Sequence, residues 1–134
     1  MVASPRRLPV RVLVAEDDDE VATLIEVMLA GDERLRIVGR ARDGREALSM
    51  GAALDPDVIL MDLQMPLMDG VEATRRLRGL GSTARIVVLT GVEEVRRLRE
   101  ARNAGADAFV TKLPTTEELI AVIMVERAPG EGRE

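Results

Sequence analysis

Polar side chains follow four separate apolar runs of this sequence, at or just beyond the point where each run ends. Glu16 and Asp17 follow "VLVA", Asp62 follows "VILM", Thr90 follows "IVVL", and Lys112 stands two residues after "AFV". If these runs are parallel strands of one sheet, the side chains gather at its carboxyl edge, where ligand chemistry concentrates in open parallel sheets. The spacing therefore predicts one shared site.

Three carboxylates brought together would repel one another and resist ionisation, and a divalent cation relieves that repulsion. The sequence contains no cysteine and no histidine, so oxygen must hold any such cation, which favours Mg²⁺, Ca²⁺ or Mn²⁺. An aspartate such as Asp62 can then attack phosphorus and form an acyl phosphate. Lys112 would offset the charge of the phosphoryl oxygens, and the Thr90 hydroxyl could donate a hydrogen bond to them. We expect Mg²⁺ as the cofactor, with Mn²⁺ as a substitute.

The stretch "ILMDLQMPLMDG" explains why Asp62 is singled out among the acidic residues. Residues 58–61 are four consecutive apolar residues, a pattern typical of a strand buried on both faces. Pro66 and the Asp69-Gly70 pair stop the strand and redirect the chain. Asp62 could instead cap the next helix, but Asp69 is better placed for that role.

Strand and helix patterns alternate along the chain. Strands are predicted at 10–15, 36–41, 58–61, 85–89 and 108–110, and helices are predicted over 21–30, from Asp43, and over 71–80, 93–104 and 115–125. Helix-length crossovers imply parallel pairing. We therefore predict an α/β fold with a flavodoxin-like, doubly wound, five-stranded parallel sheet in the order 2-1-3-4-5 and five helices. The predicted domain covers 9–126, with flexible ends at 1–8 and at 127–134, the latter being a tail or the start of a linker.

Composition narrows the functional classes. The 134 residues suit one domain, and 46% hydrophobic with 32% charged residues indicates a globular chain. No run approaches the roughly 20 apolar residues of a membrane span, and the N-terminus lacks an apolar signal core, so we expect a cytoplasmic protein. The net charge of −5 argues against direct nucleic-acid binding.

Four segments together make the chain, from about residue 10 to 126, resemble a response regulator receiver domain. They are "VLVAEDD", "DVILMDLQMPLMDG", "IVVLTG" and "AFVTK". The resemblance implies a phosphoacceptor of two-component signalling, which takes its phosphoryl group from a sensor histidine kinase or a phosphotransfer protein. It also implies a stoichiometric switch, able to phosphorylate and dephosphorylate itself, rather than an enzyme.

The resemblance assigns roles to further residues. Glu16 and Asp17 take the places of the acidic pair, and Asp17 is the more direct metal ligand. The backbone carbonyl of Gln64 takes the place of another metal ligand. Thr90 becomes the switch hydroxyl and Phe109 the switch aromatic, which together reshape the surface of the fourth helix, fifth strand and fifth helix on phosphorylation. Phe109 could instead be ordinary core.

The final predicted helix contains seven consecutive apolar residues, "LIAVIMV". Leu119, Val122 and Ile123 have the spacing of a core-facing stripe. Ile120 and Met124 would then lie on the outer side and bury against a partner, which could be a second copy, a kinase or an output domain. Alternatively, the helix is covered by its own neighbours.

Two further acidic residues and one competing function remain open. Asp18 and Asp19 suit helix capping better than metal contact. "VLVAEDDDEV" also resembles the start of haloacid-dehalogenase-type phosphatases, with Asp17 as nucleophile and Asp19 as acid/base. Against this alternative, no acidic pair follows Lys112, and little chain is left for a cap domain.

Overall fold

The computed structural model describes residues 7–112 and 114–125, apart from the side chain of Val92. The elements in chain order are β1 (Val10–Ala15), α1 (Asp19–Ala30), β2 (Leu35–Ala41), α2 (Gly44–Leu54), β3 (Val58–Asp62), α3 (Gly70–Gly79), β4 (Arg85–Thr90), the 3₁₀ helix η1 (Val92–Arg97), α4 (Leu98–Ala104), β5 (Ala108–Thr111) and α5 (Thr116–Met124). Each predicted strand is present with its ends within one residue. The predicted end segments lie largely outside the described residues, so the domain bounds stay a prediction.

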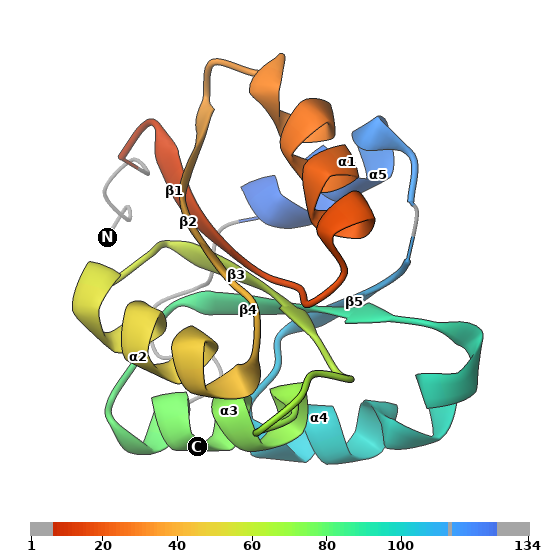
Figure 1. The fold of residues 1–134 in the computed structure, drawn as a ribbon. Helices are drawn as coiled ribbons and strands as arrows, with labels where there is room; N and C mark the ends of the chain where they lie inside the picture. The colour runs from red at the N-terminus through yellow and green to blue at the C-terminus, as the bar shows by residue number, and fades with distance from the viewer. Residues whose placement is uncertain (1–6, 113, 126–134) are drawn as a thin grey trace, which may run out of the picture.

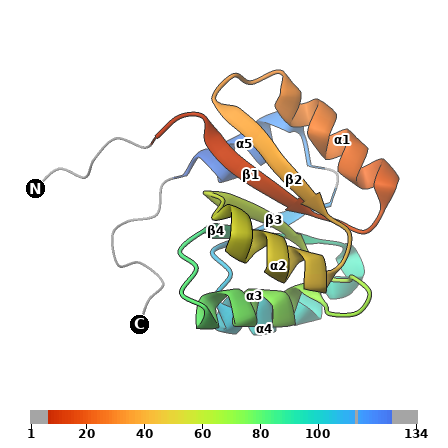
Figure 2. The same cartoon turned by 60° about the vertical axis from the view of Figure 1, so that its left-hand side comes forward.

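The five strands form one parallel sheet in the order β2-β1-β3-β4-β5, which confirms the predicted topology. Helices α1 and α5 cover one face, and α2, α3 and α4 cover the other (Figure 1). The second view shows the same three layers from the side of β2 (Figure 2). Among the described residues, no helix combines the length and apolar character needed to cross a bilayer.

Alternating strand residues divide the core into two clusters, one on each face of the sheet. Val14 and Leu60 belong to the cluster under α1 and α5, whereas Leu13 and Met61 belong to the cluster against α2, α3 and α4. Because side chains alternate along a strand, Glu16 and Asp62 continue the rows of Val14 and Leu60. Both acidic residues therefore emerge toward the α1 and α5 side of the carboxyl edge.

Helix caps stand where the sequence predicts them, with one exception. The side chains of Asp18, Asp43, Asp69 and Thr115 each accept a hydrogen bond from a backbone amide in the first turn of the following helix. Asp19 does not cap, because its carboxylate pairs with Arg40 and Arg42 of the β2 end instead.

The predicted helix over 93–104 is wrong in its first half. This segment begins as the 3₁₀ helix η1 and becomes α-helical only at Leu98. The Glu94 amide donates to the Gly91 carbonyl at 3.1 Å, and the buried Glu94 carboxylate accepts from the Gly91 amide at 3.2 Å. These bonds between residues three apart tighten the first turn.

Strand β2 contains a bulge that the sequence did not indicate. Val12 pairs with Ile37, but Leu13 pairs with Gly39, so Val38 is an extra residue in β2. A one-residue shift turns every following side chain to the opposite face of the sheet.

The loop between β3 and α3 folds back closely on the carboxyl end of β3. A Cβ added to Gly70 would lie 2.1 Å from the backbone carbonyl oxygen of Asp62. Gly79, at the other end of the same helix, has nothing within 4 Å of such a Cβ. Only the first position requires a glycine.

We predict that Gly70→Ala destabilises the protein by about 1–3 kcal/mol, because the backbone of β3 must shift to admit the methyl group. Gly79→Ala should be neutral or slightly stabilising, because alanine favours helix. Urea unfolding followed by circular dichroism checks both variants. Equal stabilities for the two would contradict the close approach at Gly70.

Candidate functional site

Two buried acidic residues and one lysine meet at the carboxyl edge of the sheet. The Lys112 ammonium lies 3.2 Å from Asp62 Oδ2 and 3.4 Å from Glu16 Oε1. Both carboxyl side chains are fully buried, whereas Lys112 is partly exposed. Strands β1 and β3 are direct neighbours, and β5 is joined to β3 through β4. The end of β1, the end of β3 and the residue after β5 thus form one basin.

Asp17 completes an acidic cluster with Glu16 and Asp62. One carboxylate oxygen from each residue lies within 4.8 Å of the other two. Within the described part of the chain, Glu16 Oε1 and Asp62 Oδ2 are buried without a well-aligned hydrogen bond, although the Lys112 ammonium lies 3.4 and 3.2 Å from them. Buried carboxylate oxygens left in this state fit a hard, oxygen-ligated dication such as Mg²⁺. The donor set therefore suits the expected metal.

The electrostatics of the basin favour a protonated Asp62 when no cation is bound. Burial and, to a lesser extent, the nearby Glu16 raise the pKa of Asp62, and Lys112 partly opposes them, so that the pKa is about 8. Burial alone would lower the pKa of Lys112, but the negative charges of Asp62 and Glu16 outweigh it and raise that pKa. One ammonium is therefore insufficient to keep both buried carboxylates ionised.

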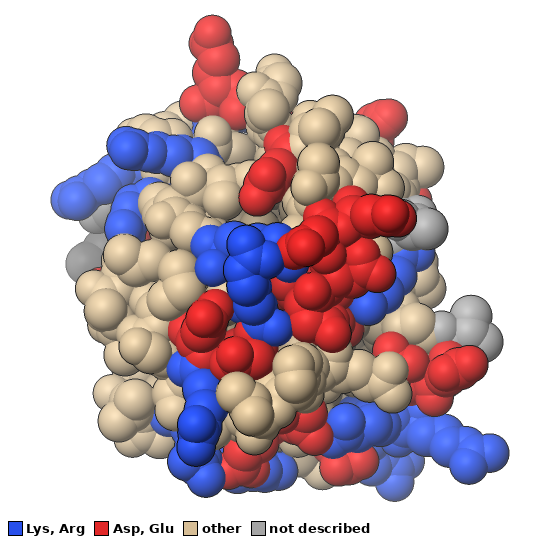
Figure 3. All heavy atoms as spheres, viewed as in Figure 1, with Lys and Arg blue, Asp and Glu red and all other residues tan. Residues whose placement is uncertain are grey.

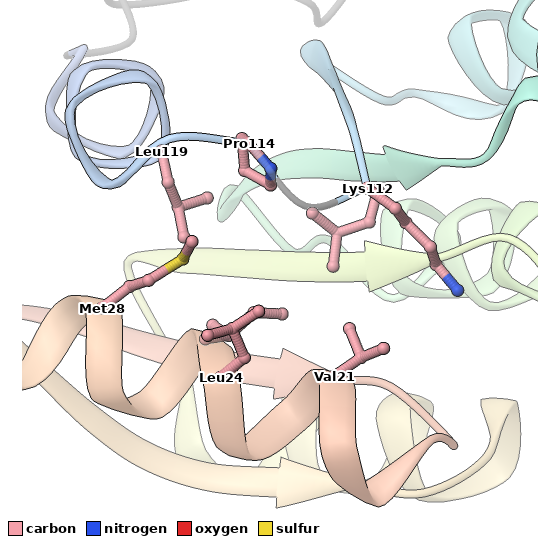
Figure 4. A pocket seen from close by; sticks show the side chains of 8 residues that line it. Val21, Leu24, Met28, Lys112, Pro114 and Leu119 are labelled. Atoms are coloured by element: carbon pink, nitrogen blue, oxygen red, sulfur yellow. The ribbon is translucent and has the colours of Figure 1, made fainter.

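The Lys112 side chain lines a small apolar pocket next to the basin. The pocket, of about 10 Å³, lies between α1 and α5 and is lined mainly by aliphatic side chains. The lysine passes along it with its nitrogen directed away from Val21, Met28 and Leu119 (Figure 4). Lys112 is the only lysine in the sequence. A compact ammonium on a flexible stem suits this position better than a wide guanidinium.

Thr90 and Phe109 lie on the other face of the sheet from Lys112. Thr90 is buried, stands one residue beyond Leu89, the β4 partner of Asp62, and donates its hydroxyl to the Gly91 carbonyl at 3.0 Å. Phe109 is half-buried and packs against the α2-α3-α4 cluster. The Arg102 guanidinium lies 5.4 Å from the centre of its ring. Phe109 thus sits between core and surface.

Gln64 lies at the rim of the basin. Its backbone amide donates to Asp62 Oδ1 at 3.3 Å, and its side chain is exposed. The two oxygens of Asp62 therefore have different neighbours, since Oδ1 accepts this amide and Oδ2 faces Lys112.

The predicted outer stripe of α5 is not fully exposed. Ile120 and Met124 are half-buried and pack against the α1-α5 cluster, and the expected core residue Val122 is also only half-buried. The exposed positions at this end are Ala121 and Val125. The apolar side of α5 is therefore wide, and most of it packs against the core of the chain itself.

Comparisons with known proteins assign the family. A family model described as the response regulator receiver domain matches residues 12–124. CheY of Halobacterium salinarum is 33% identical over 102 residues, which cover 76% of this chain and 83% of that protein. The chain therefore belongs to the response regulator receiver domain family.

Other relatives are longer than this chain. GacA of Pseudomonas aeruginosa is 40% identical over 85% of this chain, which spans 53% of GacA. A protein-glutamate methylesterase of Myxococcus xanthus is 43% identical over 78% of this chain and 30% of its own length. Among solved structures, the receiver domain named NarL from Mycobacterium tuberculosis is 28% identical with a TM-score of 0.82, over 90% of this chain and 95% of that one.

The phosphatase alternative finds no support. It requires Asp19 as a free acid/base, but the Asp19 carboxylate lies 2.6 Å from Arg40 and 2.7 Å from Arg42. Asp19 also lies outside the acidic cluster, whose members are Glu16, Asp17 and Asp62.

We predict that Asp62→Asn stabilises the metal-free protein at pH 8 but not at pH 4. The pKa of Asp62 rises from 3.8 to about 8 on folding, so the folded chain holds a proton that the unfolded chain loses between these values. Wild-type stability therefore falls as pH rises through this window, whereas the asparagine variant lacks the penalty. At pH 8, the melting temperature of Asp62→Asn should exceed that of the wild type by roughly 4 °C for each kcal/mol of stability that the variant gains.

Thermal melts in chelator at several pH values test this expectation. Glu33→Gln, an exposed surface change, is the matched control and should follow the wild type. A constant difference between Asp62→Asn and wild type across the range would contradict the raised pKa.

Proposed function

We propose that Asp62 accepts a phosphoryl group from a phosphohistidine donor and that this modification switches the domain. The supporting observation is the buried Asp62 carboxylate with the Lys112 ammonium 3.2 Å from Oδ2 and two further carboxylates beside it. A carboxylate next to a fixed ammonium, in an acidic cluster that suits a divalent cation, is an arrangement that supports nucleophilic attack on phosphorus.

In the proposed step, an oxygen of ionised Asp62 forms a bond to phosphorus while the bond from phosphorus to the donor's imidazole nitrogen breaks. The electron pair of the broken bond stays on that nitrogen, and a protonated donor keeps the proton on its other ring nitrogen, so neutral imidazole leaves. Mg²⁺, held by Glu16, Asp17, Asp62 and the Gln64 carbonyl, would neutralise the phosphoryl oxygens, and Mn²⁺ could replace it. Lys112 remains beside the product as its fixed counter-charge. Each domain accepts one phosphoryl group, and water later hydrolyses the acyl phosphate to inorganic phosphate and restores the Asp62 carboxylate.

The switch would run through Thr90 and Phe109. Thr90 now donates to the Gly91 carbonyl, and a phosphoryl oxygen on Asp62 would compete for that hydroxyl. Movement of Thr90 toward the phosphoryl group frees space on the α2-α3-α4 side, where the Phe109 ring packs. The aromatic can then turn inward and leave Arg102, which changes the α4-β5-α5 surface.

The proposed partners follow from this chemistry. A sensor histidine kinase or phosphotransfer protein would supply the phosphoryl group, and the cytoplasm is the proposed location. The α4-β5-α5 surface would contact an output domain or a second copy, and Ile120 and Met124 would contribute there only if α5 rotates or unpacks. The chain spans about half of GacA, which leaves the output of any longer protein open. Direct nucleic-acid binding by this acidic domain is not proposed.

Incubation with MgCl₂ and acetyl phosphate should add one phosphate by intact mass, and Asp62→Asn should abolish the gain. Lys112→Met should slow the gain by about 10²-fold, because a preorganised charge next to the transferred group is lost. Asp57→Asn, a control carboxylate at the opposite edge, should behave like wild type. Phosphate gain that survives Asp62→Asn would contradict the proposal.

Phosphorylation should also change the environment of Phe109. Because this residue is the only aromatic in the sequence, ¹⁹F-phenylalanine gives a single resonance. The resonance should move on phosphorylation in the wild type and stay in place in phosphorylated Thr90→Val, which lacks the hydroxyl donor. A resonance that moves equally in both proteins would contradict the proposal that the Thr90 hydroxyl controls the position of Phe109.

A further inference from the structure

The Arg40 side chain of β2 is hydrogen-bonded to the loop that carries the acidic pair. Its Nε and Nη2 both donate to the backbone carbonyl oxygen of Glu16, at 3.2 and 2.9 Å. Its Nη1 donates to Asp19 Oδ1 at 2.6 Å. The Arg40 side chain is only 16% exposed, so its two bonds to the Glu16 carbonyl are partly shielded from water, whereas the Asp19 carboxylate is 75% exposed.

The Glu16 carbonyl that accepts these bonds belongs to the peptide that links Glu16 to Asp17. The Glu16 amide donates to the Ala41 carbonyl at 3.0 Å, and Glu16 Oε2 accepts the Asp18 amide at 3.1 Å. With Arg40 on the carbonyl, both ends of Glu16 are tied to the end of β2. Asp17, by contrast, is exposed, and no hydrogen bond of its carboxylate is present among the described residues. Its position therefore depends on the peptide before it.

The β2 bulge is what brings Arg40 to this place. In a register without the bulge, Val38 would pair with Leu13 and Arg40 with Ala15, whose side chain belongs to the α2-α3-α4 cluster. With it, Arg40 pairs with Val14, on the α1-α5 side where Glu16 emerges. Bulges near functional sites commonly re-aim a side chain in this manner.

We propose that Arg40 is a positioning residue that fixes the Glu16–Asp17 peptide and thereby holds the Asp17 carboxylate at the cation site. This inference rests on the proposed function, because it assumes that the acidic cluster binds a divalent cation. Arg40 acts through the Glu16 carbonyl, and its remaining nitrogen Nη1 pairs with Asp19. Acidic and basic side chains lie side by side on this face (Figure 3).

Positioning and simple electrostatics predict opposite results for Arg40→Met. Removal of a positive charge near an acidic site should tighten cation binding if charge alone matters. Loss of the clamp should weaken binding by about tenfold, the lower range for residues that orient metal ligands. Arg40→Lys keeps the charge but loses the two-pronged grip on the Glu16 carbonyl, so it should weaken binding as well.

Arg42→Met is the matched control. Arg42 bonds the same Asp19 oxygen at 2.7 Å, and its side chain is 61% exposed. Among the described contacts, it has none with Glu16. Its loss removes the same charge from the same carboxylate and should leave the cation affinity within about twofold of wild type.

The experiment is a titration of ¹⁵N-labelled full chain with MgCl₂, followed by the amide resonances of residues 16–18, with thermal melts to establish folding. A tenfold higher dissociation constant in Arg40→Met and Arg40→Lys, with Arg42→Met unchanged, supports the proposal. Unchanged or tighter binding in Arg40→Met, or wild-type affinity in Arg40→Lys, overturns it. If Arg40→Met does not fold, Arg40→Lys decides alone. Failure of the wild type to bind Mg²⁺ would instead overturn the proposed function.

Discussion

The structure is organised around one unfavourable interaction, the burial of Asp62 beside Glu16 with a single ammonium to balance them. Both carboxyl groups are fully buried and share the contacts of Lys112. Such a pair resists full ionisation, as the raised pKa of Asp62 indicates. A divalent cation, or a phosphoryl group accompanied by one, can relieve this state. The excess of buried negative charge that destabilises the metal-free domain thus favours the binding of a divalent cation.

The sheet delivers these groups by side-chain alternation. Glu16, Asp62 and Lys112 occupy rows that point toward α1 and α5, whereas Thr90 and Phe109 occupy rows on the opposite face. The acidic basin and the Phe109 ring therefore lie on opposite faces of the sheet. Thr90, at the end of β4 next to β3, is the residue on that second face that stands beside the phosphoacceptor strand.

Much of this arrangement could be predicted from the sequence because it depends on local patterns. Apolar runs of three or four residues mark four of the five strands, and Asp43, Asp69 and Thr115 cap helices as their spacing indicates. The rest depends on contacts between segments far apart in the chain. Gly39, an isolated glycine in a strand, is compatible with the β2 bulge at Val38, but it does not reveal that the bulge turns Arg40 toward Glu16. The 3₁₀ turn of η1 similarly follows from the burial of Glu94, which helix periodicity does not reveal.

The most direct test is the ionisation of Asp62 itself, followed by its side-chain ¹³C carboxyl resonance as a function of pH. Assignment by comparison with Asp62→Asn isolates this one group. In metal-free protein, the resonance should titrate with a pKa of about 8, and saturating Mg²⁺ should move that pKa well below neutrality. Titration near the ordinary value of 3.8 without metal, unaffected by Mg²⁺, would contradict the account.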